Sequence, residues 1–153
     1  RLKKLILPNN NISDEGITAI ANSENFKQLT DLDIYGNVIS DDGVKAIAKS
    51  PYMSNLKKLS LYGNLVEDEG AIAIAESQTL SKLKHLFINS NRIRREGIES
   101  LQKAKCRTRL CHLHVDDLKD FYYEEVADED DEDLINSWEE LKARAAENRD
   151  SED

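Results

Sequence analysis

Cysteine is almost absent from this chain, which has 153 residues and only two cysteines, Cys106 and Cys111. A small domain that depends on disulfides needs several cysteines, and two that lie close together do not provide such a framework. We interpret both as reduced thiols. This interpretation favours a cytoplasmic protein, with the nucleus as the alternative location, over an extracellular one.

Long apolar runs and catalytic motifs are also lacking. No stretch approaches the roughly 18 consecutive apolar residues that a membrane span needs, and no signal peptide is visible. There is no Gly-rich phosphate loop and no G-x-S-x-G motif. Cys111 stands beside His112, but adjacent residues of a strand point to opposite faces and do not form a catalytic pair. The sequence therefore predicts a protein that is not an enzyme, carries no cofactor and binds neither a membrane nor nucleic acid.

The chain is instead organised around a phrase of eleven residues, L-x-x-L-x-L-x-x-N-x-φ, where φ is aliphatic, seen most clearly at residues 56–66. The alternation of Leu59 and Leu61 predicts a short strand with one buried face. Asn64 is the exception to the apolar pattern. Its side-chain amide can donate to and accept from backbone groups of neighbouring units, which is needed where similar units stack.

This phrase recurs every 27 residues without drift. Its first leucine stands at five positions: Leu2, Leu29, Leu56, Leu83 and Leu110. Four of the five phrases are complete, whereas the fifth has Leu118 in the position of the asparagine. An internal repeat of this length predicts a solenoid. We therefore expect an α/β solenoid over residues 1–118, followed by a helical C-terminal cap and acidic tail over residues 119–153.

A helical pattern follows each strand phrase, and in the first unit it covers residues 13–21, S-D-E-G-I-T-A-I-A. Serine or aspartate at the start can cap the free amides, the acids suit the positive end of the helix dipole, and apolar residues follow at helical spacing. We expect the glycine of each unit to let the helix lie close to the strand layer. The fourth unit differs, because Arg94 and Arg95 stand at its helix start, either as a binding surface or as a solvated pair.

The strand phrase, the full helix and the D-E-G-I-x-x-I-A signature together resemble the ribonuclease-inhibitor-like subclass of leucine-rich repeat proteins, over residues 2–118. The resemblance implies a short curved horseshoe, with parallel strands on its concave face and α-helices on its convex face. It also implies an intracellular protein, as members of that subclass are. It says little about function, because the repeated residues form the core.

In such a fold the residues between the leucines face outward from the strands, and they form the candidate site. Tyr35, Tyr62 and Phe87 form an aromatic diagonal across three neighbouring strands, and aromatic residues are enriched at interface hot spots. Charged and imidazole side chains are expected to rim this diagonal: Asp31, Asp33, Lys58, His85, His112 and His114. The alternative is that the tyrosines only pack over the adjacent turns, where Gly36 and Gly63 make room.

The sequence thus predicts a non-catalytic protein–protein interaction module that binds a partner on the concave face. The alternative is a regulator of a small GTPase, because a leucine-rich repeat domain followed by an acidic stretch resembles the Ran GTPase-activating proteins. That resemblance is one of architecture alone. No position matches their catalytic arginine, and the regular period departs from their more variable repeats.

Two candidate metal sites are weak. The imidazoles of His85, His112 and His114, with Asp116 and Cys111 nearby, form one candidate zinc cluster, but no C-x-x-C or H-E-x-x-H spacing supports it. A calcium loop over the acidic run at residues 128–133 is disfavoured, because its last residue is aspartate where an EF-hand needs glycine. We predict no bound metal.

Charge is divided unevenly along the chain. Residues 1–115 hold 17 Lys and Arg against 13 Asp and Glu, whereas residues 116–133 hold 11 acids and one lysine. We expect the run at residues 128–133 to be solvated and to attract a basic partner.

Both ends of the repeat array are expected to be atypical. Apolar residues at helical spacing are expected to cover the last coil: Leu118, Phe121, Tyr122 and Val126. At the other end no capping segment covers the first coil, so self-association through this end is a further expectation. Because the chain starts at Arg1, without a methionine or a cap, we also expect it to be a piece of a longer protein.

Overall fold

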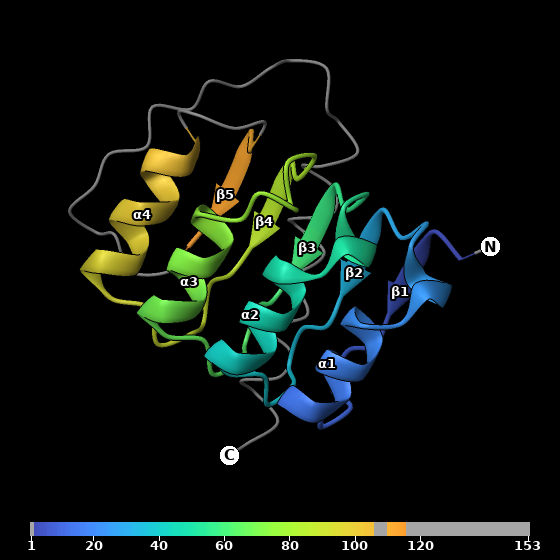
Figure 1. The fold of residues 1–153 in the computed structure, drawn as a ribbon. Helices are drawn as coiled ribbons and strands as arrows, with labels where there is room; N and C mark the ends of the chain where they lie inside the picture. Colours follow the sequence, from blue (N-terminus) through green and yellow to red (C-terminus); the bar gives the residue numbers. More distant parts are fainter. Residues whose placement is uncertain (1, 106–109, 116–153) are drawn as a thin grey trace. The chain divides into compact units, whose positions relative to one another are not determined.

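The computed structural model describes residues 2–105 and 110–115 (Figure 1). These residues all belong to the first of two units into which the chain divides, Arg1–Leu118. The expected capping residues, the acidic run at 128–133 and the rest of the predicted cap and tail at 119–153 lie outside the described residues. We number the repeats as coils one to five, which start at the five leucines 27 residues apart.

The five strand phrases form one parallel sheet in which the strand order follows the sequence. Each strand has three residues, which are centred on the second leucine of the phrase or its equivalent. Equivalent residues of adjacent coils pair directly, as Leu32 does with Leu59. The strands are β1 (Lys4–Ile6), β2 (Asp31–Asp33), β3 (Lys58–Ser60), β4 (His85–Phe87) and β5 (His112–His114).

The helical phrases form a second layer that covers one side of the sheet (Figure 1). The helices are α1 (Asp14–Ala21), α2 (Asp41–Lys49), α3 (Asp68–Ala75) and α4 (Arg95–Lys105), with short 3-10 turns η1 (Glu24–Phe26) and η2 (Pro51–Met53). The leucines of the phrase and the apolar helix positions meet between the layers, where Leu59 and Ile47 are fully buried. The predicted α/β solenoid is confirmed. None of the described helices is long and apolar enough to cross a membrane.

The asparagine of coils two, three and four joins its own coil to the preceding one, as its amide chemistry predicts. The Asn37 Oδ1 atom accepts hydrogen bonds from the backbone amides of Asn10 and Ile12, at 3.0 and 2.9 Å. Its Nδ2 group donates to the Leu7 carbonyl of coil one and to the Ile34 carbonyl of its own coil, both at 2.9 Å. Asn64 and Asn91 repeat this pattern one and two coils further on.

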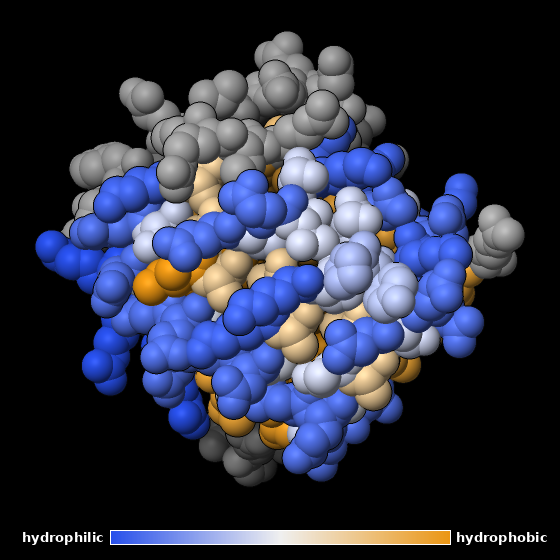
Figure 2. Space-filling view, in the orientation of Figure 1, coloured by the Kyte–Doolittle hydropathy of each residue, from blue (hydrophilic) through white to orange (hydrophobic). Residues whose placement is uncertain are grey.

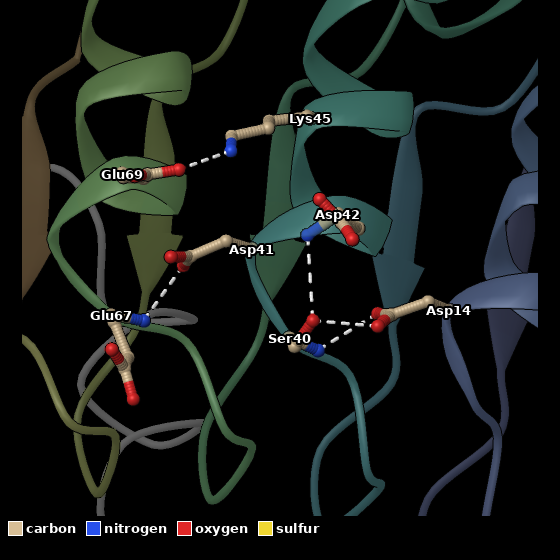
Figure 3. Close-up of polar contacts among 7 residues, drawn as sticks. All are labelled: Asp14, Ser40, Asp41, Asp42, Lys45, Glu67 and Glu69. Atoms are coloured by element: carbon tan, nitrogen blue, oxygen red, sulfur yellow. Dashed lines mark hydrogen bonds and ion pairs between the residues drawn. The ribbon is translucent and has the colours of Figure 1, made fainter.

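The aspartates at the starts of α1, α2 and α3 form a second ladder, which the sequence pattern alone did not predict. Asp14 of α1 accepts hydrogen bonds from the backbone amides of Ser40 and Gly43, at 2.8 and 3.0 Å, and from the Ser40 hydroxyl at 2.6 Å (Figure 3). Asp68 of α3 accepts from two equivalent amides of coil four. These carboxylates therefore cap the next helix in the stack. The expected capping by serine within one helix is limited to a 3.4 Å bond at Ser40, and Ser13 makes no such bond.

The glycine of the helical phrase is explained by this ladder. A Cβ atom at Gly43 would lie 2.5 Å from the Asp14 carboxylate and 2.6 Å from a methyl of Ile17, both in α1. At Gly70 it would lie 2.5 Å from the Asp41 carboxylate. The expectation that this glycine lets its helix lie close to the strand layer stays a prediction, since a methyl of the glycine's own repeat phrase would also be near, 2.8 Å away for Ile39 at Gly43 and for Val66 at Gly70. Its closest neighbour is the capping carboxylate of the preceding helix.

An ion pair also links adjacent helices at the surface. The Lys45 ammonium of α2 lies against the Glu69 carboxylate of α3 (Figure 3). The hydrogen bond from Lys45, together with its charge, lowers the pKa of Glu69 below its ordinary value, and the same hydrogen bond raises the pKa of Lys45. Because both groups are solvated, this pair adds little to the stacking that the asparagine and aspartate ladders provide.

Candidate functional site

The outer surface of the sheet, opposite the helices, gathers all the residues predicted for the site. We call this surface the sheet face. Strand register aligns its side chains in rows across the coils. The first row contains Lys4, Asp31, Lys58, His85 and His112, and the second contains Ile6, Asp33, Ser60, Phe87 and His114. A third row follows the strand ends, with Pro8, Tyr35, Tyr62 and Asn89.

Tyr35 and Tyr62 form an aromatic pair on the sheet face. Their ring centroids are 6.3 Å apart, and their planes make an angle of 64°, which is an edge-to-face contact. Both residues are half-buried, so each ring keeps an exposed part. Gly36 and Gly63 follow them with positive φ angles of 64° and 62°, and these turns direct the chain away from the sheet after each tyrosine. Large aromatic surfaces held in a fixed arrangement suit a protein interface.

Phe87 does not extend this exposed aromatic diagonal, because its side chain is fully buried. Its ring stacks face to face on the His114 imidazole, with centroids 4.7 Å apart and planes 1° from parallel. The Lys58 ammonium of the neighbouring strand β3 lies 5.3 Å from the ring centroid. The His114 ring and the Lys58 ammonium thus lie against a buried ring, and Phe87 is not the exposed anchor that the sequence predicted.

The histidines also differ in arrangement from a metal cluster. His85 stacks on His112, with ring centroids 4.8 Å apart, whereas His114 stacks on Phe87. Among the described residues, no group of three or more His, Cys, Asp or Glu side chains is placed to hold a metal ion. Asp116, a further member of the zinc hypothesis, lies outside the described residues. Cys111 is exposed.

The two aspartates of the sheet face are half-exposed but have different neighbours. Asp31 lies between Lys4 and Lys58 in the register, and its Oδ2 atom accepts a 2.6 Å hydrogen bond from the Thr30 hydroxyl. Asp33 lies between Ile6 and Ser60, so its register neighbours carry no charge. The register therefore places a lysine on each side of Asp31 and an uncharged residue on each side of Asp33.

The repeat pattern that builds this face also matches a known family. A model described as leucine-rich repeat matches residues 2–21, 28–48 and 52–75, which lie in the first three coils. The chain is a leucine-rich repeat protein. Coils four and five continue the same strand register beyond the matched residues. No curated protein matches the chain. The assignment to the ribonuclease-inhibitor-like subclass stays a prediction.

Three further residues of the sheet face were not predicted as site residues from the sequence. Ile6 is 62% exposed, which makes it the most exposed large apolar side chain among the described residues. The Ser60 hydroxyl and the Asn89 Oδ1 atom are buried, and neither has a hydrogen-bond partner within the described part of the chain. The position of Ile6 in the second row of the sheet face could be predicted from the sequence. The burial of the two polar groups was not, because it depends on how their neighbours pack.

Proposed function

We propose that this leucine-rich repeat protein is a non-catalytic interaction module that binds a protein partner through its sheet face. The observation that carries the proposal is the half-exposed pair of Tyr35 and Tyr62. The exposed side chain of Ile6 and the carboxylate of Asp33 occupy the second row, beside the row of the tyrosines. An apolar and aromatic centre with polar groups at its edge is the usual composition of a protein interface.

The helix layer is a poorer candidate for the partner surface. Figure 2 shows that this side is covered largely by hydrophilic residues, with hydrophobic residues showing only between them. Charged residues that are solvated in this way contribute little binding energy. The leucine-rich repeat thus presents two chemically different surfaces, and the sheet face is the one with aromatic anchors.

The alternative role as a regulator of a small GTPase stays a prediction. Its test is a GTP-hydrolysis assay in which the chain is added to candidate GTPases. Acceleration of hydrolysis would support the alternative, and an unchanged rate would remove it.

Replacing Tyr35 or Tyr62 by alanine is expected to weaken partner binding by about 2 kcal/mol, roughly thirtyfold, if each ring is a hot spot. The partner is first identified by a photo-crosslinking residue placed at position 62 and mass spectrometry. Calorimetric titration of each variant against that partner then gives the change in dissociation constant.

Tyr52→Ala is the matched control for this titration. Tyr52 is also half-buried, but it lies in the turn η2 and outside the rows of the sheet face. Its removal is expected to leave the dissociation constant unchanged, provided that thermal unfolding shows a folded variant. Equal affinities for the Tyr35, Tyr62 and Tyr52 variants would contradict the proposed function.

A further inference from the structure

Lysine side chains gather at the edge of the sheet where the strands of coils three and four begin. The second position of the repeat phrase is Lys57 in coil three and Lys84 in coil four. The Lys84 amide donates a 2.8 Å hydrogen bond to the Lys57 carbonyl, so the two positions are direct neighbours across the coils. Both side chains are exposed.

Lys82 adds a third positive charge at this edge. Its Nζ atom donates a 2.7 Å hydrogen bond to the Oδ1 atom of Asn55 in the preceding coil. The Asn55 Nδ2 group donates in turn to the Lys27 carbonyl of coil one, at 2.9 Å. These bonds fix the Lys82 ammonium at a residue that stands two positions before Lys57. We call the exposed side chains of Lys57, Lys82 and Lys84 the lysine edge.

The fold itself does not account for two of these charges. Lys49 and Lys103 lie in the last turns of α2 and α4, where the helix dipole favours a positive charge. Lys57 and Lys84 lie outside the helices, and neither forms an ion pair within the described part of the chain. Like charges at neighbouring positions of adjacent strands repel each other. Thr30 occupies the same position in coil two, so the repeat accepts an uncharged residue there.

The lysine edge lies at one end of the sheet face. Lys57 directly precedes β3 and Tyr62 follows the same strand, so roughly 17 Å of extended chain separates the two residues. The two aspartates of the sheet face lie in β2, outside coils three and four. The surface therefore offers aromatic rings at the strand ends and positive charge at the strand starts.

We propose that the lysine edge binds an extended acidic segment of the protein partner that the sheet face holds. The inference rests on the proposed function and adds the chemistry of the partner, which carries acidic residues beside its apolar contact with the tyrosines. Alternate side chains of an extended segment lie roughly 6.8 Å apart on one face, and adjacent strands lie about 4.8 Å apart. Two such carboxylates can therefore reach the ammonium groups of Lys57 and Lys84.

Nucleic acid and an anionic membrane are poorer occupants of the lysine edge. Both present phosphates over a surface larger than two coils, and binding them requires many separate contacts from basic side chains. The row of lysines is interrupted by Thr30 in coil two. The chain also carries a formal net charge of -9, which repels a long polyanion. A short acidic segment needs only the local positive charge.

The test is a titration of the full chain with a peptide of six aspartates, followed by amide NMR. Saturable shift changes are expected, with the largest at residues 57–58 and 82–85. A peptide of six asparagines is the uncharged control and should cause none. The variant K57E/K84E is expected to weaken binding of the acidic peptide by about tenfold or more, because it places like charges against the peptide.

K49E/K105E is the matched variant, because it makes the same change of charge at two exposed lysines in the last turns of α2 and α4. It should bind the acidic peptide as the parent chain does, once circular dichroism shows that it is folded. Equal weakening in the two double variants would reduce the effect to net charge and overturn the proposal. The absence of saturable shifts at the lysine edge would also overturn it.

Further titrations test the other occupants. An oligonucleotide of six thymidines or a phosphatidylserine vesicle that binds more tightly than the peptide would identify a phosphate-bearing occupant. Peptide binding only to a variant with amides in place of the acids at 128–133 would identify the chain's own acidic run as the occupant. Either result would overturn the proposal.

The peptide titration also separates this proposal from the proposed function. Tyr35→Ala is expected to leave the affinity for the acidic peptide unchanged, because the tyrosines lie at the other end of the strands. Peptide binding, together with tyrosine variants that keep full affinity for the partner, would support the lysine edge and contradict the tyrosine anchors. No peptide binding, together with tyrosine variants that lose affinity for the partner, would overturn only the lysine edge.

Discussion

Replacing Asn64 by alanine is expected to lower the free energy of unfolding by about 3 kcal/mol, because one buried amide left without a partner costs about 1–3 kcal/mol and each further hydrogen bond lost costs about 1 kcal/mol. The variant removes the acceptor for the Ile39 amide. The carbonyls of Ile34 and Leu61 each lose one donor but keep a second, from Asn37 and Asn91. Asn64 is 5% exposed, so water does not readily replace these bonds. Such a loss is a large part of the 5–15 kcal/mol that stabilises a typical domain. Urea unfolding followed by circular dichroism measures it.

Asn10→Ala is the matched control, because Asn10 is the same residue of the same phrase at the free end of the stack. Its side chain is exposed and bonds to Pro8 within its own coil. We expect a change of less than about 1 kcal/mol, as is usual for an exposed side chain. If the two substitutions had equal costs, the asparagine would be stabilising its own turn rather than the contact between coils.

Gly43→Ala is expected to destabilise the chain by about 3 kcal/mol, because overpacking a tight site costs more than the gain in helix propensity returns. The new methyl would lie within 2.8 Å of the Asp14 carboxylate and of two apolar side chains, so it would displace the cap of α2. Thermal unfolding by calorimetry gives the change. The loss of stability should be larger than the change of about 0.5 kcal/mol or less that a surface substitution usually produces.

The same substitution at Gly16 separates the two explanations for this glycine. Among the described residues, a Cβ atom at Gly16 would contact only a methyl of Ile12, at 3.0 Å. We expect Gly16→Ala to change stability by less than about 1 kcal/mol, since the gain in helix propensity offsets a small shift of Ile12. Equal losses at Gly16 and Gly43 would support the earlier interpretation, in which the glycine makes room for the strand layer.

The architecture was predictable from the sequence because the leucines and the asparagine recur at a constant interval. A constant interval places Leu32 beside Leu59 and Asn37 beside Asn64, so the parallel register follows directly. The rows of side chains on the sheet face follow from the same register. For this reason the neighbouring positions of Tyr35 and Tyr62 could be predicted from the sequence alone.

Phe87 shows what the repeat pattern does not contain. Alternation along a strand tells which face a side chain occupies, but not how far its neighbours on that face cover it. The ring of Phe87 is buried, and His114 and Lys58 lie against it. These contacts depend on side-chain conformations that no periodicity specifies.

The aspartate ladder was missed for a different reason. An acidic residue at a helix start is favourable with its own helix dipole, and this local explanation was sufficient. The bond from Asp14 to Gly43 crosses from one coil to the next over 29 residues. One signal in the sequence could have revealed it. The fourth coil has Arg95 in place of the aspartate, and the next coil has Glu124 in place of the glycine, so the two residues that form this contact are lost together.

The most direct test of the central claim is a map of where the identified partner binds. Amide and side-chain NMR shifts of the full chain are recorded during titration with that partner. Binding through the sheet face predicts the largest changes at Ile6, Asp33, Tyr35 and Tyr62, with small changes at the helix-layer residues Lys45 and Glu69. Large changes confined to the helix layer, with the tyrosines unaffected, would contradict the account.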